Sequence, residues 1–129
     1  MNRMLLDTHS FLWWALGDEH LPADTRRRID AADDVYVSAV TAWELRTKHR
    51  IGKLPEVSPL IVRDLAVVLR SEDFRELPVS FSDGDLAGAF SQPHKDPFDR
   101  MIAAQALNHR LPLVSNDAAL DAFGVVRVW

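Results

Sequence analysis

Short apolar stretches alternate with longer helical patterns along this chain, and that alternation restricts its fold more than any other feature. Strands are predicted at residues 3–7, 35–37, 74–79, 113–115 and 125–129. Helices are predicted at residues 9–16, 21–32, 38–50, 59–70 and 82–90. A long helix is predicted to begin at Pro97, and a single helical turn is predicted at 117–122. Parallel strands need long crossover connections, which helices provide, and they are usually buried on both faces. The sequence therefore predicts an α/β fold with a parallel sheet of about five short strands flanked by helices.

The stretch from His94 to Ala106, HKDPFDRMIAAQA, predicts a helix with acids at its start. Asp96 followed by Pro97 is typical of an N-cap and a first helical residue, because proline has no N–H to lose there. Asp99 then falls at the third helical position, where a carboxylate can interact with free backbone N–H groups. The small alanines that follow allow the helix to pack closely on a sheet. This segment would hold a carboxylate at the edge of a pocket on a rigid element.

The composition excludes several classes of protein. With 47% hydrophobic and 26% charged residues, the chain is ordinary for one globular domain, expected to span residues 1–129. It has no cysteine, which excludes disulfides and thiolate metal sites. We expect a cytoplasmic protein without a membrane span, since no signal-peptide pattern and no run of about 18 apolar residues is present. The net charge of −4 excludes binding of nucleic acid by bulk positive charge, so a polyanion must be met locally or through a bound cation.

Four acids are predicted to meet at one edge of the sheet. Ligand crevices in open α/β sheets lie outside the carboxyl ends of the strands. One acid ends the first strand, one lies early in the helix after the second strand, one opens the helix before the fourth strand and one follows that strand. These acids are Asp7, Glu44, Asp99 and Asp117.

Such a cluster needs a cation or protons to be tolerated. Two like charges about 4 Å apart repel by roughly 4 kcal/mol at an effective dielectric constant near 20. Oxygen ligands without a His or Cys cluster favour Mg²⁺ or Mn²⁺ over zinc. An ion of this kind makes water more acidic, and a pair of ions can hold both the attacking and the leaving oxygen of a phosphodiester. The acids therefore indicate the chemistry of a nuclease.

Each acid also has a purely structural interpretation. Asp99 could serve only as a favourable charge at a helix start, Asp96 only as an N-cap, and Asp117 as the cap of the turn behind it. Thr41 and Glu44 have the spacing of a capping box, although Ser38 is an equally good cap for that helix. Asp7 is harder to explain, because an acid after an apolar strand gains little if Thr8 caps the next helix. The argument rests on the joint placement of the acids.

Other polar residues carry weaker signals. The histidines, His9, His49 and His94, are expected to be surface or core residues rather than catalytic ones. Trp13 and Trp14 are expected to pack in the core, with one of them exposed at a partner surface. The basic residues of the third helix and the loop after it could contact a phosphate backbone, with a solvated basic face as the default interpretation. These residues are Arg46, Lys48, Arg50 and Lys53.

The motifs together resemble one known family. The chain carries Asp7-Thr8-His9 followed by FLWW, then SAVTAWE, then Gly52-Lys53-Leu54, then HKDPFDRMIAAQA and finally LPLVSND. In this order, over nearly the whole chain, the motifs resemble the PIN-domain family and, more narrowly, its bacterial VapC-type toxins.

The resemblance implies a three-layer PIN-like fold and a Mg²⁺-dependent ribonuclease, with Mn²⁺ as a substitute. It implies the toxin half of a toxin–antitoxin pair, neutralised by an antitoxin and often homodimeric. Asp7 and Asp99 would contact the metal, Asp117 would complete the site, and Glu44 would orient the attacking water. Residues that match the supporting positions of the family are Thr8, Ser115, where threonine is more usual, and Asp96.

Competing functions fit the sequence less well. A phosphatase with an aspartyl nucleophile needs a second acid two residues after Asp7, where this chain has His9. A phosphoacceptor receiver domain needs an acidic pair after its first strand, and Asp33 and Asp34 lie before the second one. A dinucleotide-binding fold needs a glycine-rich turn that is missing here. The remaining alternative is a PIN-like module that binds metal or protein but has lost catalysis.

Overall fold

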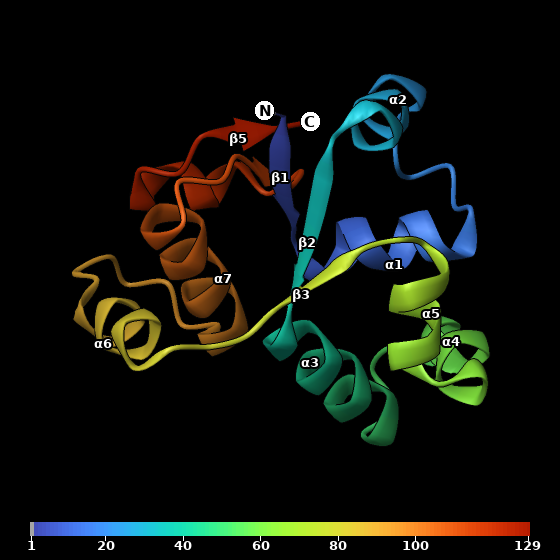
Figure 1. The fold of residues 1–129 in the computed structure, drawn as a ribbon. Helices are drawn as coiled ribbons and strands as arrows, with labels where there is room; N and C mark the ends of the chain where they lie inside the picture. Colours follow the sequence, from blue (N-terminus) through green and yellow to red (C-terminus); the bar gives the residue numbers. More distant parts are fainter. Residues whose placement is uncertain (1) are drawn as a thin grey trace.

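The computed structural model describes residues 2–129 and contains a five-stranded parallel sheet in the order β3-β2-β1-β4-β5 (Figure 1). The strands are β1 (Arg3–Leu6), β2 (Asp34–Ser38), β3 (Arg75–Leu77), β4 (Leu113–Val114) and β5 (Arg127–Val128). The strands pair in parallel throughout. The predicted α/β fold with five short parallel strands is confirmed.

The helices connect these strands as crossover segments. They are α1 (Thr8–Leu16), α2 (Ala23–Ala31), α3 (Ala39–Arg50), α4 (Ser58–Arg63), α5 (Leu65–Ser71), α6 (Phe81–Ala89) and α7 (Pro97–Asn108). Two 3₁₀ helices, η1 (Pro55–Val57) and η2 (Ala118–Phe123), complete the fold. Among residues 2–129, none of the helices has the length and hydrophobicity needed to cross a membrane.

Helices cover the sheet on two sides, which gives three layers. In Figure 1, α6 and α7 lie to the left of the sheet, and α1, α4 and α5 lie to the right. The alternation of β1 explains the two cores: Met4 and Leu6 belong to one buried cluster, whereas Leu5 belongs to the other. The second cluster includes Ala103 and Ala106 of α7, whose small side chains are almost completely buried. The prediction that alanines let this helix pack closely is confirmed.

The strand order places a crevice between β1 and β4. From β1 the chain moves through β2 to β3 on one side, and β4 then returns to the other side of β1. A crevice forms at the carboxyl end of the sheet where the order reverses in this way. Leu6 is paired with Val114, and the N–H of Asp7 donates to the carbonyl of Val114 at 3.1 Å. The residues that follow β1 and β4 are therefore neighbours.

Several predicted helix limits are wrong. The helix expected at 59–70 is two helices, because Asp64 has a left-handed φ of 77° and its carboxylate caps α5 by accepting from the N–H of Ala66. The cap of α6 is Ser80 rather than Ser82, because Ser80 and Asp83 form a complete capping box. In α3, Ser38 accepts from the N–H of Val40, so the capping-box interpretation of Thr41 and Glu44 is also wrong.

The first helix is capped by Asp7 and not by Thr8. The Oδ1 atom of Asp7 accepts a hydrogen bond from the N–H of Ser10 at 2.9 Å. The expectation that Asp7 has little structural value is therefore wrong, since it follows β1 and also caps α1. This cap fixes the Asp7 carboxylate at the carboxyl end of the sheet.

Candidate active site

The four predicted acids line one cavity of about 440 Å³. Asp7 enters it from the end of β1, Glu44 from α3 and Asp99 from the first turn of α7. Asp117 lines it from the segment that follows β4, and the other residues that line the cavity are His9, Trp13, Lys48, Asp96 and Asn116. The expected meeting of distant acids is present in the structure.

Asp7 lies at the floor of this cavity. It is 8% exposed, and burial raises the pKa of its carboxyl above the ordinary value, even though hydrogen bonding by Ser115 and Ser10 acts in the opposite direction. The hydroxyl of Ser10 donates to the carbonyl of Val114 at 2.9 Å, which ties the start of α1 to β4. Asp7 is therefore a rigidly held acid for which ionisation is unfavourable without a compensating cation.

Asp99 is a second acid of the cavity whose pKa is raised by burial. Burial raises the pKa of its carboxyl to about 6, and the charges of Asp96 and Glu44 act in the same direction. The Nε2 atom of His94 lies 3.0 Å from Asp99 Oδ2 and partly offsets this effect. The side chain of Asp99 is 26% exposed, so it lines the cavity while being partly shielded from solvent.

Glu44 is a buried carboxylate with one satisfied oxygen. Its Oε2 atom forms an ion pair with Lys48, one helical turn further along α3. Its Oε1 atom is buried and has no hydrogen-bond partner among residues 2–129. Partial burial would lower the pKa of Lys48, but the hydrogen bond and charge of Glu44, with Asp96 and Asp99, raise it. Lys48 thus stays positively charged beside the acids.

Asp117 closes the cavity from the β4 side. Its side chain caps η2 by accepting from the N–H of Ala119, and its own N–H donates to Ser115 Oγ at 3.1 Å. Ser115 is fully buried, and its carbonyl accepts from Arg127 at 3.2 Å. The Ser115 side chain therefore forms hydrogen bonds with the Asp7 side chain and with the backbone of Asp117.

Asp96 and Thr8 also take supporting places. Asp96 Oδ1 accepts from the N–H groups of Phe98 and Asp99, so it is the predicted N-cap, and it lines the cavity as well. Thr8 Oγ1 lies 3.1 Å from Thr41 Oγ1, and this buried contact joins the start of α1 to α3. This contact fixes the position of α1, which Asp7 caps, relative to α3, which carries Glu44.

The predicted basic group is divided by the structure. Lys48 faces the acids because it lies four residues after Glu44, whereas Arg46 lies about 200° around the helix from Glu44 and is exposed. Arg50 and Lys53 are also exposed and do not line the cavity. Lys48 therefore belongs to the acid cluster, and the grouping of these four residues on one polar face is wrong.

Sequence reasoning missed His94 as a member of the site. One ligand atom from each of His94, Asp99 and Asp117 lies within 4.8 Å of the others, a spacing compatible with one metal ion. The position of His94 two residues before the Asp96 cap was the available signal. His9 and Trp13 line the same cavity, whereas Trp14 packs against Phe74 and donates to Glu72.

The donor set fits a divalent cation. Five carboxylates line the cavity and are faced by one lysine, so the site carries excess negative charge. The buried, unpartnered Oε1 of Glu44 and the raised pKa values of Asp7 and Asp99 show that a compensating positive charge would be favourable here. The ligand atoms that lie close enough together for one ion belong to His94, Asp99 and Asp117, and Asp7 lines the same cavity.

Residues 4–126 match the PIN domain family. The chain belongs to this family. One relative, ribonuclease VapC22 from Mycobacterium tuberculosis (strain ATCC 25618 / H37Rv), is 28% identical over 125 residues, which covers 93% of this chain and 91% of the relative.

Solved structures share the PIN-like fold. FitAcB from Neisseria gonorrhoeae superimposes with a TM-score of 0.66 at 24% identity, over 98% of this chain and 96% of that one. VapBC2 from Rickettsia felis, bound to a DNA fragment from their promoter, gives a TM-score of 0.69 at 16% identity, over 98% and 97%. A toxin–antitoxin complex from Klebsiella pneumoniae gives 0.60 at 18% identity, over 98% and 96%. At these identities the likeness supports the fold alone.

Proposed function

We propose that this PIN-domain protein is a ribonuclease that depends on Mg²⁺ or Mn²⁺, cleaves RNA internally and is the toxin of a type II toxin–antitoxin system. The observation that carries the proposal is the single cavity lined by Asp7, Glu44, Asp99 and Asp117, which come from four separate parts of the chain. The 28% identity to ribonuclease VapC22 over most of both chains supports the choice of RNA as the substrate.

The residues of the cavity would have different roles in phosphodiester hydrolysis. A divalent ion held by Asp7, Asp99 and Asp117 would stabilise the negative charge that develops on the phosphate and make a nearby water molecule more acidic. Glu44 presents a free, desolvated oxygen that can accept a proton from the attacking water. Lys48 holds the other oxygen of Glu44 and so fixes the direction of the free one.

The same cavity could belong to a PIN-like module that binds metal or protein without catalysis. This alternative would tolerate loss of the proton acceptor, because ion binding needs only some of the acids. The buried Glu44, whose ion pair with Lys48 leaves one oxygen free, favours the enzyme.

We expect the purified protein to cleave RNA in the presence of Mg²⁺ or Mn²⁺ and to lose this activity in EDTA. The physical reason is that the uncompensated acids repel a phosphate until a cation is bound. Cleavage is measured by gel analysis of a defined RNA, and restoring excess Mg²⁺ after EDTA is the control. Cleavage that persists in EDTA would contradict the proposal, whereas metal binding without cleavage would favour the inactive module.

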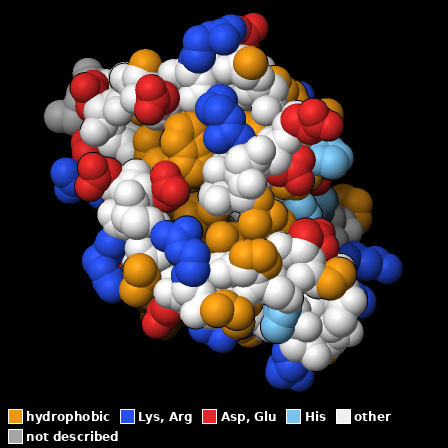
Figure 2. Space-filling view, turned by 90° about the vertical axis from the view of Figure 1, so that its right-hand side faces the viewer, with side chains coloured by type: hydrophobic (Ala, Val, Ile, Leu, Met, Phe, Trp, Pro, Cys, Tyr) orange, Lys and Arg blue, Asp and Glu red, His pale blue; other side chains and the backbone are white. Residues whose placement is uncertain are grey.

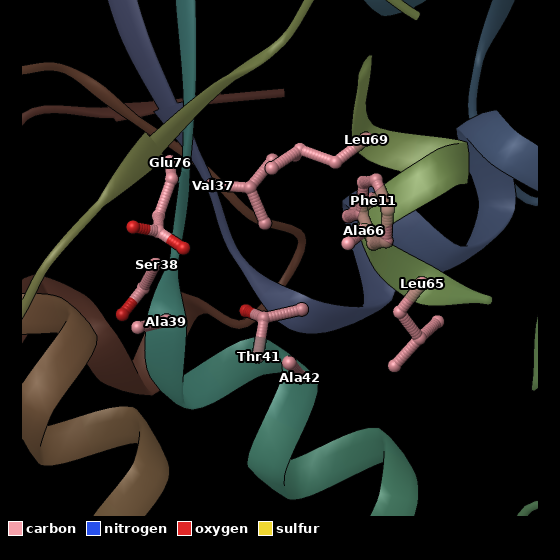
Figure 3. A pocket seen from close by; sticks show the side chains of 10 residues that line it. All are labelled: Phe11, Val37, Ser38, Ala39, Thr41, Ala42, Leu65, Ala66, Leu69 and Glu76. Atoms are coloured by element: carbon pink, nitrogen blue, oxygen red, sulfur yellow. The ribbon is translucent and has the colours of Figure 1, made fainter. Parts of the chain in front are cut away.

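A second hollow is suited to an antitoxin segment. It has a volume of about 100 Å³ and lies between α1, α3 and α5, lined mainly by apolar side chains such as Phe11, Leu65 and Leu69 (Figure 3). Figure 2 shows the neighbouring face, where apolar side chains gather in the middle and charged ones lie around them. The exposed Val62 and Val67 of α4 and α5 add to the apolar surface of the protein.

We propose that an antitoxin lays an apolar segment in this hollow and a basic residue in the acid cavity. A toxin–antitoxin complex among the solved structures of the same fold is the reason for choosing an antitoxin as the partner. The excess negative charge of the cavity favours an Arg over a neutral side chain.

The antitoxin proposal predicts inhibition of RNA cleavage by a peptide from the cognate antitoxin, complete at saturation. Changing the proposed Arg of the peptide to Gln should weaken inhibition about tenfold or more, because a charge-assisted contact is lost. The measurement is a titration of peptide against cleavage rate, with a scrambled peptide as control. Full activity at saturating peptide would count against the proposed partner.

A further inference from the structure

The imidazole of His94 faces the acids of the cavity. Its Nε2 atom lies 3.0 Å from Asp99 Oδ2, and its side chain is 21% exposed. Together with Asp117, these residues offer ligand atoms that all lie within 4.8 Å of one another. The acids Asp7, Glu44, Asp99 and Asp117 were expected from the sequence, but a nitrogen atom in the same cluster was not.

The loop that carries His94 is held by Arg100 of α7. The Arg100 guanidinium donates to the carbonyl of His94 at 3.0 Å, and also to those of Gln92 at 2.8 Å and Phe90 at 2.7 Å. The ring of His94 packs edge-on against Phe123, with ring centroids 5.6 Å apart. The imidazole is therefore fixed from its backbone and from its ring, as expected for a functional side chain with a defined orientation.

The distance between His94 and Asp99 suits two ligands of one ion. Ligands at about 2.1 Å from an octahedral ion, in adjacent positions, are about 3.0 Å apart. The observed separation of 3.0 Å between Nε2 and Oδ2 has this value. A hydrogen bond between His94 and Asp99 would have a similar length. As a metal ligand Nε2 directs its lone pair at the ion, whereas as a hydrogen-bond donor it directs its proton at the acid.

An independent observation is that one acid of the same cavity has an oxygen atom without a partner. The Oε1 atom of Glu44 is buried and has no hydrogen-bond partner in the described part of the chain, and Glu44 is 2% exposed. Leaving such an oxygen unpaired is unfavourable unless a ligand satisfies it. Glu44, Asp99 and Asp117 line the acid cavity, and His94 is joined to this group by its contact with Asp99.

We propose that His94 supplies a nitrogen ligand to the divalent ion held by Asp99 and Asp117, and that it makes this site favour Mn²⁺ over Mg²⁺. This inference rests on the proposed function, since it concerns the same ion. Imidazole binds Mg²⁺ poorly, whereas first-row transition ions accept nitrogen and oxygen ligands together. The oxygen-only ligand set expected from the sequence would show a weaker preference.

Electron spin echo spectroscopy of Mn²⁺ tests the ligand directly, because a directly bound imidazole gives a nitrogen modulation. We expect this modulation in the wild-type protein, a change in it on ¹⁵N-histidine labelling, and its loss in His94→Asn. Asparagine can still donate a hydrogen bond to Asp99, so the variant separates a ligand from a hydrogen-bond donor. The matched control is His9→Asn, because His9 lines the cavity and packs on Trp13 but is outside the three-residue cluster.

Calorimetric titration adds a second readout. His94→Asn should weaken Mn²⁺ binding about tenfold or more and Mg²⁺ binding by less than about threefold, whereas His9→Asn should leave the ratio of the two affinities unchanged. Wild-type protein without nitrogen modulation, or modulation retained in His94→Asn, would overturn the role of His94. RNA cleavage with oxygen-bound Mn²⁺ would leave the proposed function standing, and absence of any Mn²⁺ binding would overturn both.

Discussion

Replacing Asp99 with asparagine is expected to reduce RNA cleavage by at least about 10³-fold while leaving the protein as stable as the wild type or more so. The loss follows because a metal-binding carboxylate contributes several kcal/mol to transition-state stabilisation, and about 4 kcal/mol corresponds to 10³-fold. Stability is retained because asparagine has nearly the same shape and relieves the repulsion by Asp96 and Glu44 that helps to raise the pKa of Asp99. Cleavage rate and Tm, measured on the same preparation, check both parts.

Asp7→Asn should also lose RNA cleavage while keeping its stability, and the structure gives a reason to expect unchanged stability. Asp7 caps α1 through the N–H of Ser10, and asparagine is as good a cap as aspartate. The substitution therefore removes the charge while keeping the cap. A large loss of cleavage with an unchanged Tm would separate the chemical role of this acid from its structural one.

The matched control is Asp64→Asn. Asp64 caps α5 through the N–H of Ala66, but it is exposed and does not line the acid cavity. We expect its cleavage rate and its Tm to stay near the wild-type values. Normal cleavage by Asp7→Asn or Asp99→Asn would show that the acid cavity is not the site of RNA hydrolysis.

The second large effect is expected in the pH dependence of stability. In metal-free buffer, the free energy of unfolding should fall as the pH rises from about 4 to about 6, in contrast to the usual behaviour of paired carboxylates. Burial raises the pKa of Asp99 to about 6, so in this window the folded protein binds more protons than the unfolded chain. Asp7, whose pKa is raised for the same reason, acts in the same direction.

The size of this effect follows from the shift. Moving the pKa of Asp99 from 3.8 to about 6 corresponds to at most about 3 kcal/mol, and solvent screening at a partly exposed group reduces this to about 1–2 kcal/mol. For a domain of this size, the change is about 3–8 °C in Tm. The stabilisation is fully present below about pH 4 and is lost as the pH passes 6.

Adding Mn²⁺ should reverse the loss, because an ion that binds only the folded state raises the free energy of unfolding. The increase in Tm should be larger at pH 7.5 than at pH 5, where protons compete for the same carboxylates. Thermal unfolding in EDTA and in Mn²⁺, at both pH values, measures this. Asp99→Asn is the control, since it should show a weaker pH dependence and a smaller response to Mn²⁺. An equal response in this variant would contradict the assignment of Asp99.

Two surfaces of different chemistry lie close together on this PIN domain. The acid cavity requires a cation or a basic residue, whereas the hollow between α1, α3 and α5 requires apolar side chains. Thr41 lines the hollow, and its hydroxyl contacts Thr8, the residue next to Asp7. A single bound segment could therefore reach from one surface to the other, as the proposed inhibition by an antitoxin requires.

Local patterns in the sequence predicted the parallel sheet and the edge of the sheet at which the acids lie. Periodicity identified the strands, and parallel strands put their carboxyl ends at one edge, so Asp7 and Asp117 were expected to meet there if their strands were neighbours, which the pairing of β1 with β4 confirms. The N-cap at Asp96 fixed the start of α7 and with it the position of Asp99. These features depend on local patterns and on a general rule of topology, which one sequence contains.

The roles that depend on contacts between distant segments could be seen only in the folded chain. It assigned Lys48 to Glu44 rather than to a basic face, made Asp7 a helix cap as well as a site residue, and brought His94 to the acids through the loop held by Arg100. A loop has no periodicity from which its path can be inferred, and burial is set by everything that packs around a residue. For that reason the types of residue in the site could be predicted, whereas their protonation and their full set of partners required the fold.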